Sequence, residues 1–276
     1  MKTLLTRSIS GLIFVSVVLL SLLLSKNYLV LLFAAVSGIC FYEFHKMFKS
    51  DKLLNFNPII SGIIASIGFL ISVNHYMPIP IFEFSEDFGK YGLLSMMTIL
   101  ICIQLLFQAK NAFSNIALIL LGTVYILIPL ILGAIVHIKD DSGDLPILLF
   151  VFLLVWINDT FAYLSGMLFG KHKMAPKISP KKTWEGFIGG LLFTIMAAYL
   201  IHLFESNYSM FWVYSAVIIA PAAVLGDLFE SYLKRKNKIK DTGNIMPGHG
   251  GLLDRFDAML FAIPFFYIWH VIYTFI

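Results

Sequence analysis

The residue types that could carry out chemistry are concentrated in one segment of the chain, residues 226–257. Four of them fall at i, i+3, i+4 and i+7 and would share one stripe of a helix: Asp227, Glu230, Ser231 and Lys234. Asp254 and Asp257 lie one helical turn apart where the next apolar stretch begins. Carboxylates beside a lipid phase are costly, and several at close range repel one another unless a cation lies between them. We therefore expect the acids of the two stretches to hold a divalent cation, and their hard oxygen ligands favour Mg²⁺ or Mn²⁺.

The loop between these two stretches has the composition of a phosphate-binding turn. The chain turns at Pro247-Gly248, and two more glycines, Gly250 and Gly251, follow His249. Backbone N–H groups in such a flexible turn could approach a phosphate closely. Basic residues flank the turn, among them Lys234, Arg235, Lys240 and Arg255. The alternative is that the acids form salt bridges with Lys234, Arg235 or Arg255 and stabilise the helix ends.

A second polar cluster interrupts the apolar stretch around residues 156–166. On a helix, Asn158 and Asp159 would point about 100° apart, whereas Asp159 and Tyr163 would share one face. An ionisable side chain deep in an apolar helix is a functional candidate. We therefore expect Asn158 and Asp159 on a face of the substrate or metal cavity, and the alternative is a polar contact between two helices.

The segment 170–186 has the features of an anion-binding helix start. Ser179 is a good N-cap, and Pro180 suits the first helical position. Lys181 and Lys182 would then lie in the first turn, where cations are normally disfavoured and a docked anion would resolve the conflict. We expect a phosphate clamp here, and the alternative is that both lysines are anchors at the membrane interface.

Membrane helices must position these residues. Of the 276 residues, 59% are hydrophobic and 13% are charged, which is about half the charged fraction of a soluble domain. The apolar residues come in blocks of roughly 20, the length that a helix needs to cross a bilayer. We predict an all-α, polytopic integral membrane protein with about nine transmembrane helices, at residues 8–25, 28–47, 58–73, 92–108, 115–137, 145–168, 184–204, 209–233 and 257–276.

The distribution of basic residues predicts the orientation. With the N-terminus in the cytoplasm, all but three of the 20 Lys and Arg residues lie on the cytoplasmic side. The polar loops 170–183 and 234–256 then face the cytosol and its nucleotides. We divide the chain into N-terminal transmembrane helices, residues 1–138, and a C-terminal catalytic transmembrane region, residues 139–276. The first apolar block, Ile9–Leu24, is expected to be a retained helix rather than a signal peptide.

Glu43 is the exception in an N-terminal half that is nearly free of intramembrane charge. We expect an interfacial acid that pairs with Lys46 or lies beside His45, and the alternative is membership of a polar cluster. Cys40 and Cys102 both lie in apolar stretches and are expected to be packing residues rather than disulfide partners.

Residues 231–257 also resemble the signature of a known family, the CDP-diacylglycerol synthases, or phosphatidate cytidylyltransferases. The matching positions are Ser231, Lys234, Arg235, Lys240, Asp241, Pro247, His249, Gly250, Gly251, Asp254, Arg255 and Asp257. The segment SPKKTWEG at residues 179–186 is also similar to that family. The resemblance covers residues 150–276 firmly, whereas the N-terminal half is similar only in its several hydrophobic spans.

The resemblance implies a homodimeric membrane enzyme that condenses CTP with phosphatidic acid to give CDP-diacylglycerol and pyrophosphate. It implies that Asp227 and Asp254 bind Mg²⁺, with a monovalent cation such as K⁺ assisting. We accordingly expect no nucleic-acid partner. We expect the protein in the bilayer of the cell inner (plasma) membrane, with its active site facing the cytoplasm.

Such a transfer needs positioning and charge neutralisation more than covalent chemistry. The residues that we expect to take part in catalysis are Asp227, Asp254, Asp257, Lys234, Arg235 and His249. The residues that we expect to bind substrate are Ser179, Lys181, Lys182, Asn158, Asp159, Ser231, Lys240, Asp241, Gly250, Gly251 and Arg255. Two alternatives are a CTP-dependent polyprenol or phytol kinase, which transfers the γ-phosphate, and a cation-coupled transporter that uses the intramembrane acids as its ion site.

Overall fold

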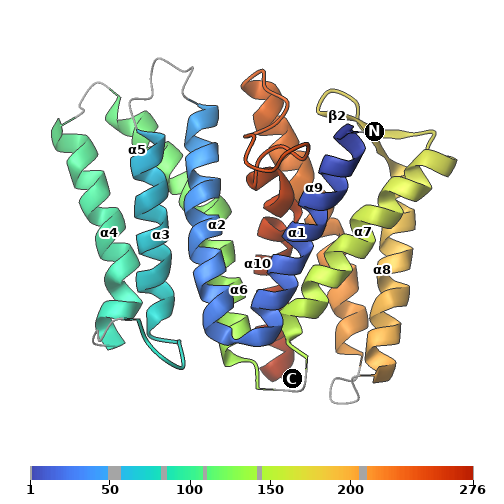
Figure 1. Cartoon of the computed structure of the whole chain (residues 1–276), viewed down its shortest axis with the longest axis horizontal. Coiled ribbons are helices and arrows are strands. Elements are labelled where there is room, and N and C mark those ends of the chain that lie inside the picture. Colours follow the sequence, from blue (N-terminus) through green and yellow to red (C-terminus); the bar gives the residue numbers. More distant parts are fainter. Residues whose placement is uncertain are drawn as a thin grey trace. The chain divides into compact units, whose positions relative to one another are not determined.

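The computed structural model of the protein describes residues 2–48, 57–81, 86–107, 111–141, 145–204 and 210–275. The chain forms two compact units, which are coloured by sequence in Figure 1. Unit 1 consists of Met1–Lys139 and Ile239–Arg255, and unit 2 consists of Asp140–Lys238 and Phe256–Ile276. The polar loop after residue 238 therefore belongs to the unit of the N-terminal helices. Our division of the chain at residue 138 concerns function and stays a prediction.

Unit 1 is a bundle of helices. Its elements are α1 (Lys2–Leu24), α2 (Lys26–Met47), α3 (Pro58–Asn74), α4 (Glu86–Phe107), α5 (Ala112–Gly122), the π-helix η1 (Thr123–Leu127) and α6 (Ile128–Lys139). Local sequence explains two of the starts. The Ser25 side chain accepts a hydrogen bond from Asn27 N at the start of α2, and Asn57 caps α3 ahead of Pro58 at its first position.

Small residues let α2 and α3 pack closely side by side (Figure 1). A Cβ added to Gly62 would lie 3.2 Å from the Tyr42 Cβ and would collide with the backbone of Gly38. Such small-residue contacts are typical of helices that pack in membranes. Phe33 and Phe44 of α2, with other large apolar side chains of the unit, are fully buried.

Unit 2 combines four helices with a short hairpin. Its elements are α7 (Ile147–Phe169), β1 (Lys173–Ala175), β2 (Ser179–Thr183), α8 (Trp184–Phe204), α9 (Phe211–Lys236) and α10 (Leu253–Phe275), whose first three residues belong to unit 1. The two strands are antiparallel, with Lys173 opposite Thr183 and Ala175 opposite Ser179. Gly190 allows α8 to approach α7, because an added Cβ would lie 2.9 Å from the backbone oxygen of Asn158.

The helices are those of a polytopic membrane protein, as the sequence predicts. Within the described residues, seven helices are long and apolar enough to cross a membrane, and two shorter apolar helices, Pro58–Asn74 and Tyr91–Leu106, accompany them. Many large apolar side chains are exposed on these helices, among them Leu12, Leu106 and Leu168. A bilayer would cover such a surface. The count of nine spans and their orientation stay predictions.

The predicted helix start at Ser179 is wrong. Residues Ser179–Thr183 form β2, and α8 begins five residues later, at Trp184. The first turn of α8 uses another hydroxyl, because Gly186 N donates to Thr183 Oγ1 at 3.2 Å. Thr183 is therefore the N-cap, and Lys181 lies on a strand rather than in the first turn of a helix.

Candidate functional site

The loop of unit 1, residues 239–255, makes the turn that the sequence predicts at Pro247-Gly248. Met246 N donates to Gly250 O at 3.0 Å, and His249 N donates to Met246 O at 2.9 Å. Gly248 and Gly250 have φ angles of 77° and 86°, which side chains other than that of glycine rarely allow. The glycines of this motif are therefore needed for the conformation of the turn.

Asp254 closes this loop on itself. Its Oδ2 accepts hydrogen bonds from Gly251 N at 2.8 Å and from Thr242 N at 3.0 Å. A Cβ added to Gly250 would lie 2.7 Å from the same oxygen. Backbone donors from both ends of the loop thus fix the orientation of this carboxylate.

Glu43 of α2 reaches the same loop from the N-terminal helices. The side chain is fully buried. Its Oε2 accepts hydrogen bonds from Leu253 N at 2.8 Å and Thr242 Oγ1 at 3.3 Å, and its Oε1 accepts one from Leu252 N at 3.2 Å. The first N–H groups of a helix lack partners within the helix, and Glu43 supplies acceptors at the start of α10.

The expected pairing of Glu43 with Lys46 is wrong, and the polar-cluster alternative is confirmed. Lys46 is exposed, and its ammonium lies 5.4 Å from the centre of the Tyr42 ring. A Cβ added to Gly243 or Gly251 would collide with the Glu43 carboxylate. The loop glycines therefore make room for an acid whose partner lies 209 or 210 residues away in the sequence.

His249 lies among cationic groups. Arg255 Nε donates to His249 O at 3.1 Å, and the Ser10 hydroxyl oxygen of α1 lies 2.7 Å from His249 Nδ1. Loss of hydration, and then the charges of Arg255 and Arg7, lower the pKa of the His249 imidazole from its ordinary 6.5. The folded protein therefore disfavours protonation of this ring.

An ion pair between Lys182 and Asp227 marks the polar cluster of unit 2. Lys182 Nζ lies 2.6 Å from Asp227 Oδ2, and Ser231 Oγ donates to Asp227 Oδ1 at 3.2 Å. The predicted stripe of α9 thus places the Ser231 hydroxyl against Asp227, and Lys182 of β2 contacts the same carboxylate. The two charged side chains are 23% and 37% exposed, so the pair stays accessible to a charged ligand.

Two further carboxylates, on α7 and α10, belong to the same cluster. The charge of Asp227 acts on both Asp159 and Asp257, and the charge of Lys182 acts on Asp159. Asn158 is fully buried and donates to Asp159 Oδ1 at 3.4 Å. Unit 2 therefore brings together three of the predicted acids, and their roles in binding stay predictions.

The alternative of a salt bridge between an acid and a base applies to Glu230 and Lys234, in another part of the α9 stripe. Glu230 is fully buried and is paired with Lys234 one turn further along α9. Arg235 Nε donates to Ile178 O in the hairpin at 3.4 Å. Of the remaining predicted substrate ligands, Ser179 is half-buried, and three are exposed: Lys181, Lys240 and Asp241.

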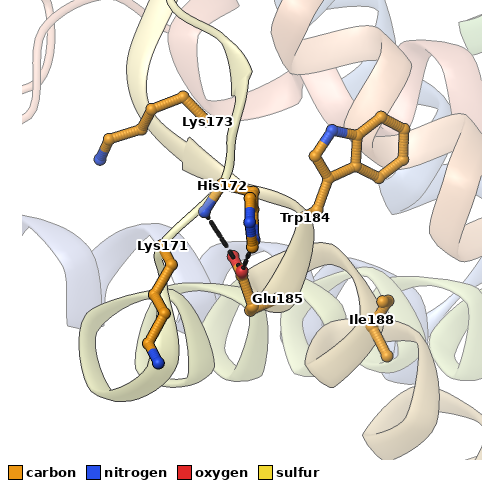
Figure 2. Close-up of a pocket in the computed structure, with 6 residues that line it drawn as sticks. All are labelled: Lys171, His172, Lys173, Trp184, Glu185 and Ile188. Atoms are coloured by element: carbon orange, nitrogen blue, oxygen red, sulfur yellow. Dashed lines mark hydrogen bonds and ion pairs between the residues drawn. The ribbon is translucent and has the colours of Figure 1, made fainter.

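An open pocket of about 660 Å³ beside the hairpin contains a pair that the sequence analysis did not single out. His172 Nδ1 lies 2.6 Å from Glu185 Oε1, and His172 N donates to the same carboxylate at 3.2 Å. Figure 2 shows Lys171 and Lys173 on one side of this pair and two lining residues of α8 on the other. The pair joins the start of the hairpin to the first turn of α8, thirteen residues later in sequence.

The acids of both units offer oxygen ligands, which are the ligands that Mg²⁺ prefers. In the part of the chain that the structure describes, no three His, Cys, Asp or Glu side chains form a group that could hold a metal ion. Mg²⁺ usually takes one or two carboxylates and completes its coordination with water and substrate phosphates. The residues present therefore fit an ion that is shared with a phosphorylated substrate, and the Mg²⁺ assignment stays a proposal.

The fold and the site define a class of helical membrane proteins. In this class, polar clusters contain carboxylates that can bind a hard cation and basic side chains that can bind phosphate. The chain belongs to the cytidylyltransferase family, whose model matches residues 5–273. The match includes the N-terminal helices, for which the sequence motifs alone gave only a general similarity.

Several bacterial proteins are similar to the chain over most of its length. The phosphatidate cytidylyltransferase of Staphylococcus saprophyticus is 37% identical over 219 residues, which cover 77% of this chain and 82% of that protein. A protein of the same name from Staphylococcus epidermidis is 36% identical with the same coverage. The phosphatidate cytidylyltransferase of Staphylococcus aureus is 33% identical over 254 residues, which cover 90% and 92% of the two chains.

Proposed function

We propose that the protein is a phosphatidate cytidylyltransferase of phospholipid biosynthesis, which converts CTP and phosphatidic acid into CDP-diacylglycerol and pyrophosphate. The observation that carries this proposal is the similarity to proteins of that name over as much as 90% of the chain. The polar clusters of both units support it, because they supply bases for phosphates and acids for a cation within a membrane protein.

In the proposed reaction, a phosphate oxygen of phosphatidic acid attacks the α-phosphorus of CTP and forms a new P–O bond. The bond from the α-phosphorus to the oxygen that bridges to the β-phosphorus breaks, and pyrophosphate leaves with that oxygen and its electron pair. Both reactants are anions, so the barrier depends on alignment and on neutralisation of charge. No covalent enzyme intermediate is needed.

Basic side chains of both units would neutralise the phosphates. Lys182 is already held beside a carboxylate, and its ammonium can contact a phosphate that approaches Asp227. Arg255 is exposed beside the glycine turn, where it keeps donors for an anion. Lys181 and Lys240 are exposed and can adapt to a flexible triphosphate.

We also propose Asp227 and Asp254 as the carboxylates that bind Mg²⁺. The bound ion would neutralise charge on the phosphate oxygens. The protein holds each carboxylate ready in its own unit, Asp227 through Ser231 and Asp254 through the N–H groups of Gly251 and Thr242. Such outer partners orient ligands and tune their basicity.

Further parts of the assignment concern assembly and location. We propose a homodimer in the cell inner membrane, with its polar loops facing the cytoplasm and K⁺ as an assisting ion. The skewed distribution of Lys and Arg supports the orientation. Its test is the accessibility of a single cysteine at Lys240 to a membrane-impermeant thiol reagent, applied to inside-out and right-side-out vesicles of a variant without Cys40 and Cys102.

The activity is tested with the purified full chain in lipid nanodiscs and with CTP labelled at either the α- or the γ-phosphorus. A cytidylyltransferase transfers the α-label to the lipid and releases the γ-label as pyrophosphate. A kinase would transfer the γ-label to the lipid. Failure to consume CTP, together with cation-driven uptake of a solute into proteoliposomes, would indicate a transporter and contradict the proposal.

A further inference from the structure

Arg7 of α1 lies against the glycine turn of unit 1. Its side chain packs across Gly248, where an added Cβ would lie 2.8 Å from Arg7 Cγ and 3.6 Å from Arg7 Nε. Any side chain at position 248 would displace the arginine, apart from the strain imposed by the φ angle of 77°. The guanidinium group is therefore held beside the turn of the polar loop.

Ser10 and Gly11 follow on the same face of α1, three and four residues after Arg7. Ser10 Oγ donates to Pro247 O at 3.0 Å and lies 2.7 Å from His249 Nδ1. The same hydroxyl lies 3.1 Å from Arg7 O of its own helix, so Ser10 links α1 to both ends of the turn. A Cβ on Gly11 would lie 3.4 Å from the imidazole Cε1, so this face of α1 fits the turn closely.

The turn thus has an arginine on α1 and a second arginine at the start of α10. Arg255 Nε donates to His249 O at 3.1 Å, and the charges of Arg7 and Arg255 both act on His249. Among the described residues, no carboxylate is paired with Arg7. The nearby carboxylate of Asp254 accepts from backbone N–H groups of the loop. Two guanidinium groups beside one glycine turn, without a paired acid, are the arrangement that an anion stabilises.

We propose that Arg7 and Arg255, which lie beside the glycine turn at His249, bind a phosphate group through their guanidinium groups, so that α1 contributes directly to the substrate site. The planar guanidinium groups suit the bidentate recognition of phosphate oxygens. Ser10 acts as a positioning residue, because its hydroxyl contacts Pro247 O and His249 Nδ1 and so holds the turn against α1. This phosphate site rests on the proposed function, since the phosphate would belong either to CTP and pyrophosphate or to phosphatidic acid.

The test measures equilibrium binding of labelled pyrophosphate and of labelled short-chain phosphatidic acid to the full chain in nanodiscs. Arg7→Gln is compared with Arg7→Lys and with Lys46→Gln, which removes an exposed cation of α2 whose ammonium lies over the Tyr42 ring. Loss of one arginine–phosphate contact is expected to weaken binding about tenfold or more. Arg7→Lys should recover part of the loss, because a lysine keeps the charge but not the planar fork.

If Arg7→Gln binds pyrophosphate more weakly than the wild type does, the site binds a phosphate of the nucleotide. If it binds phosphatidic acid more weakly, the site binds the phosphate of the lipid. Either result supports the phosphate site if Lys46→Gln binds as the wild type does and Arg7→Gln keeps the wild-type melting temperature. Unchanged binding of both ligands to Arg7→Gln, or an equal loss in Lys46→Gln, would overturn it. Because the assay needs no turnover, absence of CTP consumption by the wild type would reject the proposed function and leave this binding result to decide the phosphate site.

Discussion

Glu43→Gln tests whether an N-terminal helix positions the polar loop. The carboxylate of Glu43 accepts three hydrogen bonds with its two oxygens, from Leu252 N, Leu253 N and Thr242 Oγ1. A glutamine offers one acceptor oxygen and turns an NH₂ group towards backbone donors. The variant therefore keeps the size of the side chain and loses the acceptors on one side.

The expected cost follows from these contacts. A hydrogen bond to a charged group contributes about 1.5–3 kcal/mol, so loss of the acceptors on one oxygen should disfavour the native loop by about 3 kcal/mol. If only the native loop aligns Asp254, the turnover rate falls about 100-fold, since 1.36 kcal/mol corresponds to a factor of ten. The helices of unit 1 should remain folded, because their apolar packing is untouched.

The assay is pyrophosphate release from CTP and phosphatidic acid in nanodiscs, with helical content and melting temperature measured on the same samples. Ser37→Ala is the matched control, because Ser37 is a fully buried polar residue of α2 whose hydroxyl donates to Ala34 O of its own helix. The control should keep wild-type turnover. Wild-type turnover in Glu43→Gln, or equal losses in both variants, would refute the positioning role.

Three further predictions concern the hairpin, the ion pair and the imidazole. Thr183→Ala should destabilise the start of α8 by about 1 kcal/mol and lower the melting temperature, whereas Ser179→Ala should not; equal effects of the two would contradict the N-cap assignment. Asp227→Asn should abolish turnover while the protein still inserts and folds, and near wild-type turnover at limiting Mg²⁺ would exclude a metal-binding role. The pKa of His249 lies below its ordinary 6.5, so the folded protein disfavours protonation of the imidazole. The imidazole therefore destabilises the fold only as the pH falls below 6.5. Between pH 6.5 and pH 8 the wild type and His249→Gln should therefore show the same relative pH profile of turnover, and a wild-type transition that the variant lacks would show that the imidazole titrates there.

The sequence predicts the parts of the molecule that depend on local pattern. The apolar blocks predict the positions of the helices, because one helix must cover the thickness of a bilayer. Helical spacing predicts the contact of Ser231 with Asp227, and the dipeptide Pro247-Gly248 predicts the turn of the loop. Each of these features is decided within a few residues of the chain.

Two expectations fail because the deciding partner is backbone rather than a side chain that the sequence pattern reveals. Ser179 and Thr183 both offer a hydroxyl ahead of α8, and pairing with residues 173–175 draws Ser179 into a strand. Glu43 binds backbone N–H groups more than 200 residues away, and backbone donors carry no sequence signature. A charged neighbour such as Lys46 is visible in the sequence, but an exposed lysine gains little from pairing and does not compete.

The proposed function requires that the protein transfers the cytidylyl group of CTP to the phosphate of a membrane lipid. The most direct measurement is Mg²⁺-dependent pyrophosphate release from α-labelled CTP by the full chain in nanodiscs, with and without phosphatidic acid. We expect release only when the lipid is present, equal molar transfer of the α-label to the lipid, and loss of both in Asp227→Asn. Release without lipid, transfer of the γ-phosphate, or full activity of Asp227→Asn would contradict it.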